Sequence, residues 1–482
     1  MNARPRSPFF ATLAICIATG LSACATGGLA ESPQPRVPQS WQAELPHGGR
    51  AENLRHWWQQ FDDARIAALV EMAEHDSPTL TQTWANIEKA RATLRSTQAQ
   101  ALPSVSASAS ASRSNQIQTG QSAVAGASRS AGFDASWELD LFGKVRRGAE
   151  AAEARVEART ADWHDARVSL AAEVADTYVR YRACMLLADA YRREVASTAA
   201  TEKATTSAVQ AGFTARSEGA LARASSASGQ ANLLQQTTQC GLLVKSLVYL
   251  TGTEEPSLRQ LIAESKDRMP QPSALHVQAV PAQLLRQRPD LASLEREVAA
   301  TGAEIGVAKS DLYPSLSLSG SVSVSANSLV SPTTLWSFGP SLSIPLFDGG
   351  QRRAAVDSAR ASYVSALAGY QQGVRTVVRD VEEALLNLDG ARRRTEQAET
   401  AAREYRRYFN SIESDWRAGR TTLLSLEEAR RSALNAEITE ITLQQNRVQY
   451  WIALYKAVGG GWQPETPVTA PEIQAADRLA KQ

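Results

Sequence analysis

The segment LFGKVRR at residues 141–147 recurs 205 residues later as LFDGGQR at residues 346–352. Two other short segments recur at similar offsets of 211 and 207 residues: LPSVS at 102–106 with YPSLS at 313–317, and AGFT at 211–214 with AGRT at 418–421. Three pairs of markers at nearly one spacing indicate an internal duplication. The repeated unit is about 205 to 210 residues long and occurs twice.

Each repeat contains two Ser-rich segments in which apolar and polar residues alternate, a pattern that predicts β-strands. Four strands are expected, at about residues 103–113, 131–141, 314–325 and 336–346. Each has about the ten residues that a tilted strand needs to cross a bilayer. The polar faces carry Asp134, Glu138 and Asp140, which a dry core would not accept, so the alternation favours a membrane barrel over a soluble sandwich. Four strands cannot close a barrel, and three chains would supply twelve.

A long stretch rich in Ala, Arg, Glu and Gln follows each strand pair, and these residues are good helix formers. No proline occurs between Pro103 and Pro256 or between Pro345 and Pro464. Two antiparallel helical hairpins are therefore predicted, at about residues 143–250 and 349–458, with a long arm on the order of 100 Å each. The predicted fold class is an α+β membrane protein with internal duplication, in which a trimeric 12-stranded β-barrel continues into a long α-helical coiled-coil barrel.

The N-terminus has the features of a secretion signal: basic Arg4 and Arg6, then an apolar run, then small residues. The segment LSAC at 21–24 resembles the bacterial lipobox, which implies lipid attachment at Cys24 and, because Ala25 is not acidic, delivery to the outer membrane. The predicted organisation is a signal peptide at 1–23, a lipidated tether at 24–56, a first repeat at 57–270, a second repeat at 271–462 and a tail at 463–482.

Composition excludes several classes of function. The net charge is +1, from 51 basic and 50 acidic residues, so a nucleic-acid partner is not expected. Beyond the first 30 residues no apolar run is long enough for a transmembrane helix. The five histidines show no metal-ligand spacing, and no nucleophile elbow, phosphate-binding loop or dinucleotide motif occurs. We therefore expect no enzyme activity and no cofactor other than the lipid on Cys24.

The chain resembles the TolC-like outer membrane efflux proteins, and within them the NodT-like lipoprotein branch. The resemblance covers nearly the whole mature chain and rests on six ordered segments: WWQQF at 57–61, WELDLFGKVR at 137–146, RPDL at 288–291, IGVAK at 305–309, PLFDGG at 345–350 and LYKAVGGGW at 454–462. It implies a homotrimer in outer-membrane lipids that meets a periplasmic adaptor and an inner-membrane pump, usually of the resistance–nodulation–division class. Such a channel is a passive conduit.

The resemblance also implies a gate at the periplasmic tips. Trp416 and Arg417 precede the second Ala-Gly marker, and Glu428 and Arg431 follow it; in relatives, aromatic, acidic and basic residues at such positions link helices and hold the aperture shut. Trp416 stands where the family usually has Tyr, and Glu428 where it usually has Asp. The alternative is that Glu428 and Arg431 form an exposed i,i+3 pair worth a few tenths of a kcal/mol.

Two cysteines, Cys184 and Cys240, remain after the signal peptide and the lipid site are set aside. They lie about 29 residues before and about 27 after the first hairpin turn, so antiparallel helices would place them at nearly one height. We predict a disulfide that clamps the first hairpin; the alternative is two buried free thiols. The second hairpin has no such pair.

Two other functions remain open from the sequence. Type I protein secretion uses a similar outer-membrane channel, although the lipobox favours efflux. A periplasmic adaptor lipoprotein also carries a lipobox and a helical hairpin, but it has one hairpin flanked by small β modules rather than two hairpins each preceded by a strand pair. The cargo also stays open, because drugs, metals, plant compounds and a secreted protein all suit a polar lumen.

Overall fold

The computed structural model of the 482-residue chain describes residue 58 and residues 61–116, 124–263, 268–271, 287–327, 330–462 and 468. These residues fall into two compact units. The first comprises Asn86–Thr160 and Ser293–Gln371, and the second comprises the described residues of Pro35–Ala85, Ala161–Ala292 and Gln372–Gln482. The predicted signal peptide, the predicted tether and nearly all of the predicted tail lie outside the described residues.

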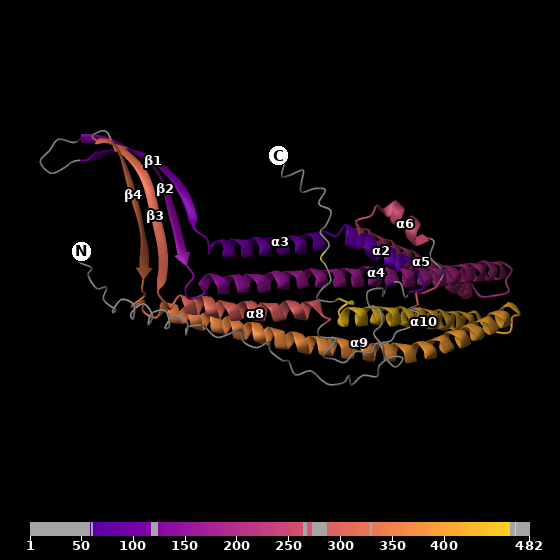
Figure 1. Cartoon of the computed structure of the whole chain (residues 1–482). Coiled ribbons are helices and arrows are strands. Elements are labelled where there is room, and N and C mark those ends of the chain that lie inside the picture. The colour runs from indigo at the N-terminus through magenta and orange to yellow at the C-terminus, as the bar shows by residue number, and fades with distance from the viewer. Residues whose placement is uncertain are drawn as a thin grey trace, which may run out of the picture. The chain divides into compact units, whose positions relative to one another are not determined.

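The first unit contains a four-stranded antiparallel sheet with its strands in chain order (Figure 1). The strands are β1 (Ser104–Gln116), β2 (Val124–Leu139), β3 (Ser315–Asn327) and β4 (Val330–Ser343). At about 3.3 Å per residue, the 13 residues of β1 extend about 43 Å, which crosses a hydrocarbon core of about 30 Å at a tilt near 45°. β1 and β4 are the edge strands of the described sheet, and each therefore presents a row of backbone groups to a further strand.

Two strands begin earlier than the sequence pattern predicts. β2 begins at Val124 rather than near residue 131, and β4 at Val330 rather than near residue 336. The residues at 125–130 are small apart from Arg129, so they form no apolar face that a period of two could reveal. They are strand because they pair with β1, as Gly126 does with Ser114. The partner strand therefore sets this boundary.

The predicted position of Asp140 on a strand face is wrong. β2 ends at Leu139, and the Asp140 carboxylate accepts hydrogen bonds from Val145 N (3.1 Å) and Arg146 N (2.9 Å) at the start of the next helix. A carboxylate in this place satisfies backbone N–H groups that have no partner in the helix itself. The second repeat uses Asp348 in the same way, and the N–H groups of Gly350 and then Arg352 lower the pKa of Asp348.

The principal helices occur in pairs of nearly equal length, as a duplication predicts. The pairs are α3 (Pro78–Ala99) and α8 (Pro289–Ser310), 22 residues each; α4 (Lys144–Gln210) and α9 (Gln351–Arg417), 67 each; and α5 (Arg216–Thr251) and α10 (Leu423–Ala457), with 36 and 35. At about 1.5 Å per residue, 67 residues span about 100 Å. Among the described helices, none combines the length and apolar character that crossing a lipid bilayer requires.

Contacts between the two repeats stabilise the first unit. The ring of Phe142, before α4, stacks on Tyr313, before β3, with centroids 4.8 Å apart. Arg155 on α4 forms an ion pair with Glu304 on α8 at 2.7 Å. Such half-exposed pairs contribute about 0–1 kcal/mol each, so the ring stack and the shared sheet hold the repeats together more than the charges do.

The second unit holds the largest apolar core, to which both hairpins and the short helices α2 (Arg65–His75) and α6 (Glu255–Ala263) contribute. Its fully buried side chains include Leu69 from α2, Leu247 from α5 and Leu385 from α9. Tyr178 on α4 is buried among them, and its hydroxyl donates to Asp63 Oδ2 at 2.6 Å. This bond gives the one buried polar group of Tyr178 a partner and fixes the start of α2 against the first hairpin.

Both hairpins turn with the same backbone geometry. Gly212 and Gly419 adopt positive φ angles of 78° and 71°. The next residue donates back across the helix end, Phe213 N to Ala208 O (2.9 Å) and Arg420 N to Asp415 O (2.8 Å). This is the Schellman ending, in which glycine takes a left-handed conformation without steric cost. The Ala-Gly markers of the sequence are therefore the two turns.

We expect Gly459→Ala to lower the stability of the second unit far more than Gly419→Ala. Both glycines have positive φ, which costs an alanine about 1–2 kcal/mol. A Cβ on Gly459 would also lie 1.9 Å from the backbone oxygen of Gln287, whereas a Cβ on Gly419 meets open space. Thermal unfolding of the purified variants checks this, and equal melting temperatures for the two would contradict it.

Candidate functional site

The sheet has one apolar and one polar face. Its antiparallel register aligns one row through Ala107, Phe133, Val322 and Trp336, and the adjacent row through Ser106, Asp134, Ser321 and Ser337. Directly paired residues share a face, and successive residues alternate between faces. Phe133 and Trp336 are 60% and 79% exposed, and an apolar patch of this kind marks a surface that meets lipid or protein. The other face offers hydroxyls and a carboxylate to water.

The four predicted gate residues lie around the second turn but do not form one contact. Trp416 is half-buried and packs on an apolar cluster that includes Leu426. Arg417 is exposed, and its guanidinium donates to Glu413 Oε1 at 2.9 Å on the same helix. Glu428 and Arg431 are exposed on α10, and within the described part of the chain no ion pair joins them.

The buried charges near this turn are instead Glu427 and Arg430, one residue earlier in each case, which the sequence analysis missed. Their side chains form an ion pair, although they are only 9% and 5% exposed. Arg430 Nη2 also donates to Thr201 Oγ1 on α4 at 2.8 Å, and its guanidinium lies over the ring of Phe409 on α9, 5.7 Å from the centroid. Arg430 therefore links α10 to both long helices.

A signal for this pair exists in the sequence. Leu423, Leu426, Glu427 and Arg430 follow the spacing i, i+3, i+4 and i+7, which is one face of a helix. Because Leu423 and Leu426 are buried, that face is the buried one, and it carries Glu427 and Arg430 inward with it. Glu428 and Arg431 each lie one residue further along, which places them about 100° around the helix from this buried face and leaves them exposed.

Cys184 on α4 and Cys240 on α5 form a disulfide in the structure, with Cα atoms 5.6 Å apart. Both residues are 5% exposed and pack with Ala188. The side chain of Gln236 donates to Cys184 Sγ (3.0 Å) and to Cys184 O (3.3 Å). The bridge therefore fixes the register of the two arms of the first hairpin. The sequence has no cysteine in the second hairpin.

Two other predictions concern ligands. Cys24, the predicted lipid site, lies outside the described residues. Within the described ranges, no group of three or more His, Cys, Asp or Glu side chains is arranged to hold a metal ion.

Comparison with known proteins identifies similar chains over nearly the full length. Residues 69–253 and 280–460 match the family described as outer membrane efflux protein, and each range lies within one of the two repeats. Outer membrane protein OprJ of Pseudomonas aeruginosa is 29% identical over 471 residues, which cover 95% of this chain and 97% of that protein. Nodulation protein T of Rhizobium leguminosarum bv. trifolii is 28% identical over 474 residues, or 96% and 98%.

The structure is also similar to solved channels. The outer-membrane channel OprN superposes with a TM-score of 0.78 at 30% identity, over 90% of this chain and all of that one. This likeness confirms the predicted fold class, an α+β membrane protein that gives four strands to a twelve-stranded trimeric barrel and two helical hairpins to its helical extension.

Proposed function

This chain belongs to the outer membrane efflux protein family, and we propose that its trimer is a passive conduit for small molecules that an inner-membrane pump expels. The chain is an outer-membrane efflux channel subunit that extends into the periplasm. The pump we propose is of the resistance–nodulation–division class, connected through a periplasmic adaptor. The conduit itself contributes no chemistry, and no cofactor takes part.

One observation carries this proposal. Each repeat joins a pair of strands, which have one apolar and one polar face, to a hairpin whose long arm has 67 residues. Polar rows such as Asp134, Ser321 and Ser337 suit a water-filled lumen, while Phe133 and Trp336 suit lipid. A periplasmic adaptor with one hairpin has no need of this duplicated arrangement.

The test uses a strain that keeps its adaptor and pump but lacks this gene. Supplying the chain should restore low steady-state accumulation of a fluorescent pump substrate, and a parallel strain with an inactive pump should show no restoration. Conductance of the purified protein in planar bilayers gives an independent reading. A chain that inserts and conducts but leaves accumulation high would contradict its assignment to efflux by that pump.

We also propose that Cys24 carries the lipid that fixes each chain to the outer membrane. A single acyl chain gives only marginal membrane binding, whereas several anchor firmly. Cys24→Ser, exported behind an ordinary cleaved signal, should lose radiolabelled palmitate but keep its barrel, since the strands span the membrane independently. We expect slower trimer assembly rather than loss of the channel. Palmitate labelling that survives the substitution would refute the lipid site.

The gate proposal concerns Glu428 and Arg431, whose exposure leaves them available to another chain of the trimer. If Glu428 pairs with a cation across that interface, Glu428→Arg replaces attraction with repulsion and should raise uptake of a large antibiotic several-fold. Glu396→Arg, an equally large charge change on the exposed face of α9, is the matched control. Equal uptake by both variants would remove Glu428 from the gate.

A further inference from the structure

The charged side chains of the four strands are sorted by face. Arg113 on β1 and Arg129 on β2 are the cations, and Asp134 and Glu138 on β2 are the carboxylates. Arg129 is four residues from Phe133 and therefore lies on the same, apolar face. The unbroken register of β1 with β2 places Arg113 on that face as well. Both cations therefore lie on the apolar face, and both carboxylates lie on the polar one.

The two arginines are also close to each other. Arg113 is paired with Ala127, and Arg129 is paired with Ala111, so the two arginines are diagonal neighbours on one face. Diagonal neighbours of an antiparallel pair lie about 7–8 Å apart, which is within reach of long side chains. Both arginines are exposed. Their guanidinium groups can therefore contact the same anion.

The depth of the arginines in the membrane follows from the length of β2. The helices, which extend into the periplasm, adjoin one end of the sheet, and β1 ends and β2 begins at the other end (Figure 1). Leu139, on the apolar face, is the last residue of β2, at the helix end. Arg129 is ten residues from Leu139, which is about 33 Å along the strand and a rise of about 23 Å at a tilt near 45°. The apolar band of an outer-membrane barrel is about 25 Å tall, so the arginines lie at its outer boundary.

The outer part of the sheet has no carboxylate that could pair with these arginines. Residues 102–133 and 312–347 contain no Asp, Glu or Lys, and their only charged side chains are Arg113 and Arg129. In the trimeric barrel the edge strand β1 meets β4 of a second copy, and β4 lies within residues 312–347. The positive charge at this boundary is therefore not balanced by any residue of the strands or of the segments that connect each strand pair.

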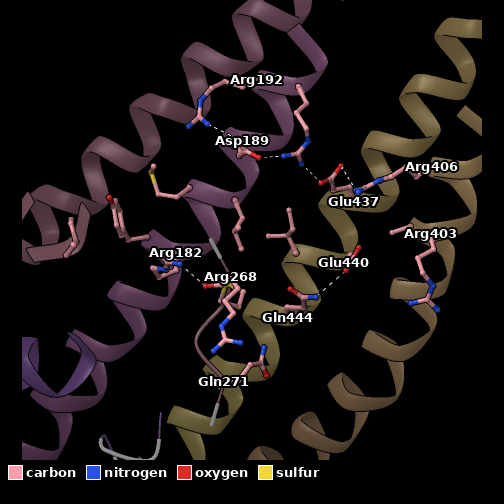
Figure 2. A pocket seen from close by; sticks show the side chains of 18 of the residues that line it. Arg182, Asp189, Arg192, Arg268, Gln271, Arg403, Arg406, Glu437, Glu440 and Gln444 are labelled. Atoms are coloured by element: carbon pink, nitrogen blue, oxygen red, sulfur yellow. Dashed lines mark hydrogen bonds and ion pairs between the residues drawn. The ribbon is translucent and has the colours of Figure 1, made fainter. Parts of the chain in front are cut away.

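Arginines elsewhere in the chain have carboxylate partners. In the second unit Glu437 lies between Arg193 and Arg406, with Arg406 Nη2 at 3.0 Å (Figure 2). Asp189 accepts from Arg192 at 2.9 Å and also from Arg193. For the two arginines on the strands, an anionic partner has to come from the surroundings of the sheet.

We propose that Arg113 and Arg129 bind a phosphate group on the headgroup of an outer-leaflet lipid, whose acyl chains lie along the apolar face. Basic residues at a membrane surface attract anionic lipids, and a guanidinium binds phosphate through two parallel hydrogen bonds. The outer leaflet of an outer membrane supplies phosphate and acyl chains in one molecule, the lipid A part of lipopolysaccharide. The proposal rests on the outer-membrane location of the chain and not on efflux, so either can fail without the other.

The test titrates the full-length trimer in detergent with diphosphoryl lipid A and counts the bound molecules by native mass spectrometry. Arg113→Gln with Arg129→Gln removes both strand cations and should weaken binding about tenfold or more. Arg91→Gln with Arg407→Gln, which removes two exposed cations from α3 and α9, is the matched control and should bind as the wild type does. The same spectra give the mass of the trimer, so they show that each variant has assembled.

Two further probes identify the part of the lipid that is recognised. Dephosphorylated lipid A keeps the acyl chains, and we expect it to bind the wild type about as weakly as diphosphoryl lipid A binds the strand variant. Inorganic phosphate in large excess should not displace diphosphoryl lipid A. Equal binding of the two lipids, equal affinity in the two double variants, or displacement by inorganic phosphate would each overturn the proposal.

Discussion

Arg430→Ala should destabilise the second unit by about 3–5 kcal/mol per chain, because it leaves a buried carboxylate without its cation. The Arg430 and Glu427 side chains are only 5% and 9% exposed, so water cannot take the place of the missing guanidinium. The substitution also removes the bond to Thr201 Oγ1 and the contact with the Phe409 ring. A fall in the melting temperature of the purified trimer measures the effect.

Two further variants define the cause. Arg407→Ala removes a charge from an exposed position on α9 and should change stability by no more than about 0.5 kcal/mol. Replacing both buried charges with apolar residues, Glu427→Leu with Arg430→Met, should restore most of the loss, since buried ion pairs contribute little beyond a well-packed apolar pair. If the double variant is as unstable as Arg430→Ala, packing rather than the orphaned carboxylate explains the loss.

The same variant has a consequence for the conduit. Arg430 connects α10 of the second hairpin to Thr201 of the first, so it opposes any separation of the two hairpins in this unit. Arg430→Ala in live cells should therefore raise uptake of a large antibiotic, and the apolar double variant should stay leaky even though its stability recovers. That pattern distinguishes a link that restrains opening from one that only supports folding.

The features that the sequence predicts correctly are those that repeat or that follow a strong periodicity. The duplication, the strand pairs and the long hairpins depend on regular spacing of apolar residues and on the absence of proline over more than 100 residues. The two turns are predicted because glycine is needed where φ is positive. Local physical chemistry determines each of these.

The sequence does not predict features that depend on a partner elsewhere in the fold. The first residues of β2 adopt a strand conformation because they pair with β1. Asp140 lies outside β2 because its carboxylate accepts hydrogen bonds from N–H groups at the start of α4. The identity of the buried pair Glu427 and Arg430 depends on which face of α10 meets α4 and α9. A shift of one residue along a helix is small in a sequence motif, yet it separates an exposed charge from a buried one.

Loss of the Cys184–Cys240 bridge should destabilise the first hairpin by about 4 kcal/mol, the value that chain entropy gives for a loop closed over a separation of 56 residues. Cys184→Ala with Cys240→Ala is the suitable variant, because both sites are buried beside Ala188 and an alanine there buries no hydroxyl. Hydrogen exchange should accelerate in α4 and α5, with little change in α9 and α10.

Reduction provides the control for this result. Reductant should lower the melting temperature of the wild-type trimer toward that of the double variant, and it should leave the variant unchanged. The bridge lies within the first hairpin, whereas Arg430 connects the second hairpin to the first. Losing the bridge should therefore loosen the arms of the first hairpin. It should raise antibiotic uptake less than Arg430→Ala does. Two titratable thiols in the mature wild-type protein, measured by mass spectrometry without reductant, would exclude the bridge, and the stability of the first hairpin would then have to come from helix packing alone.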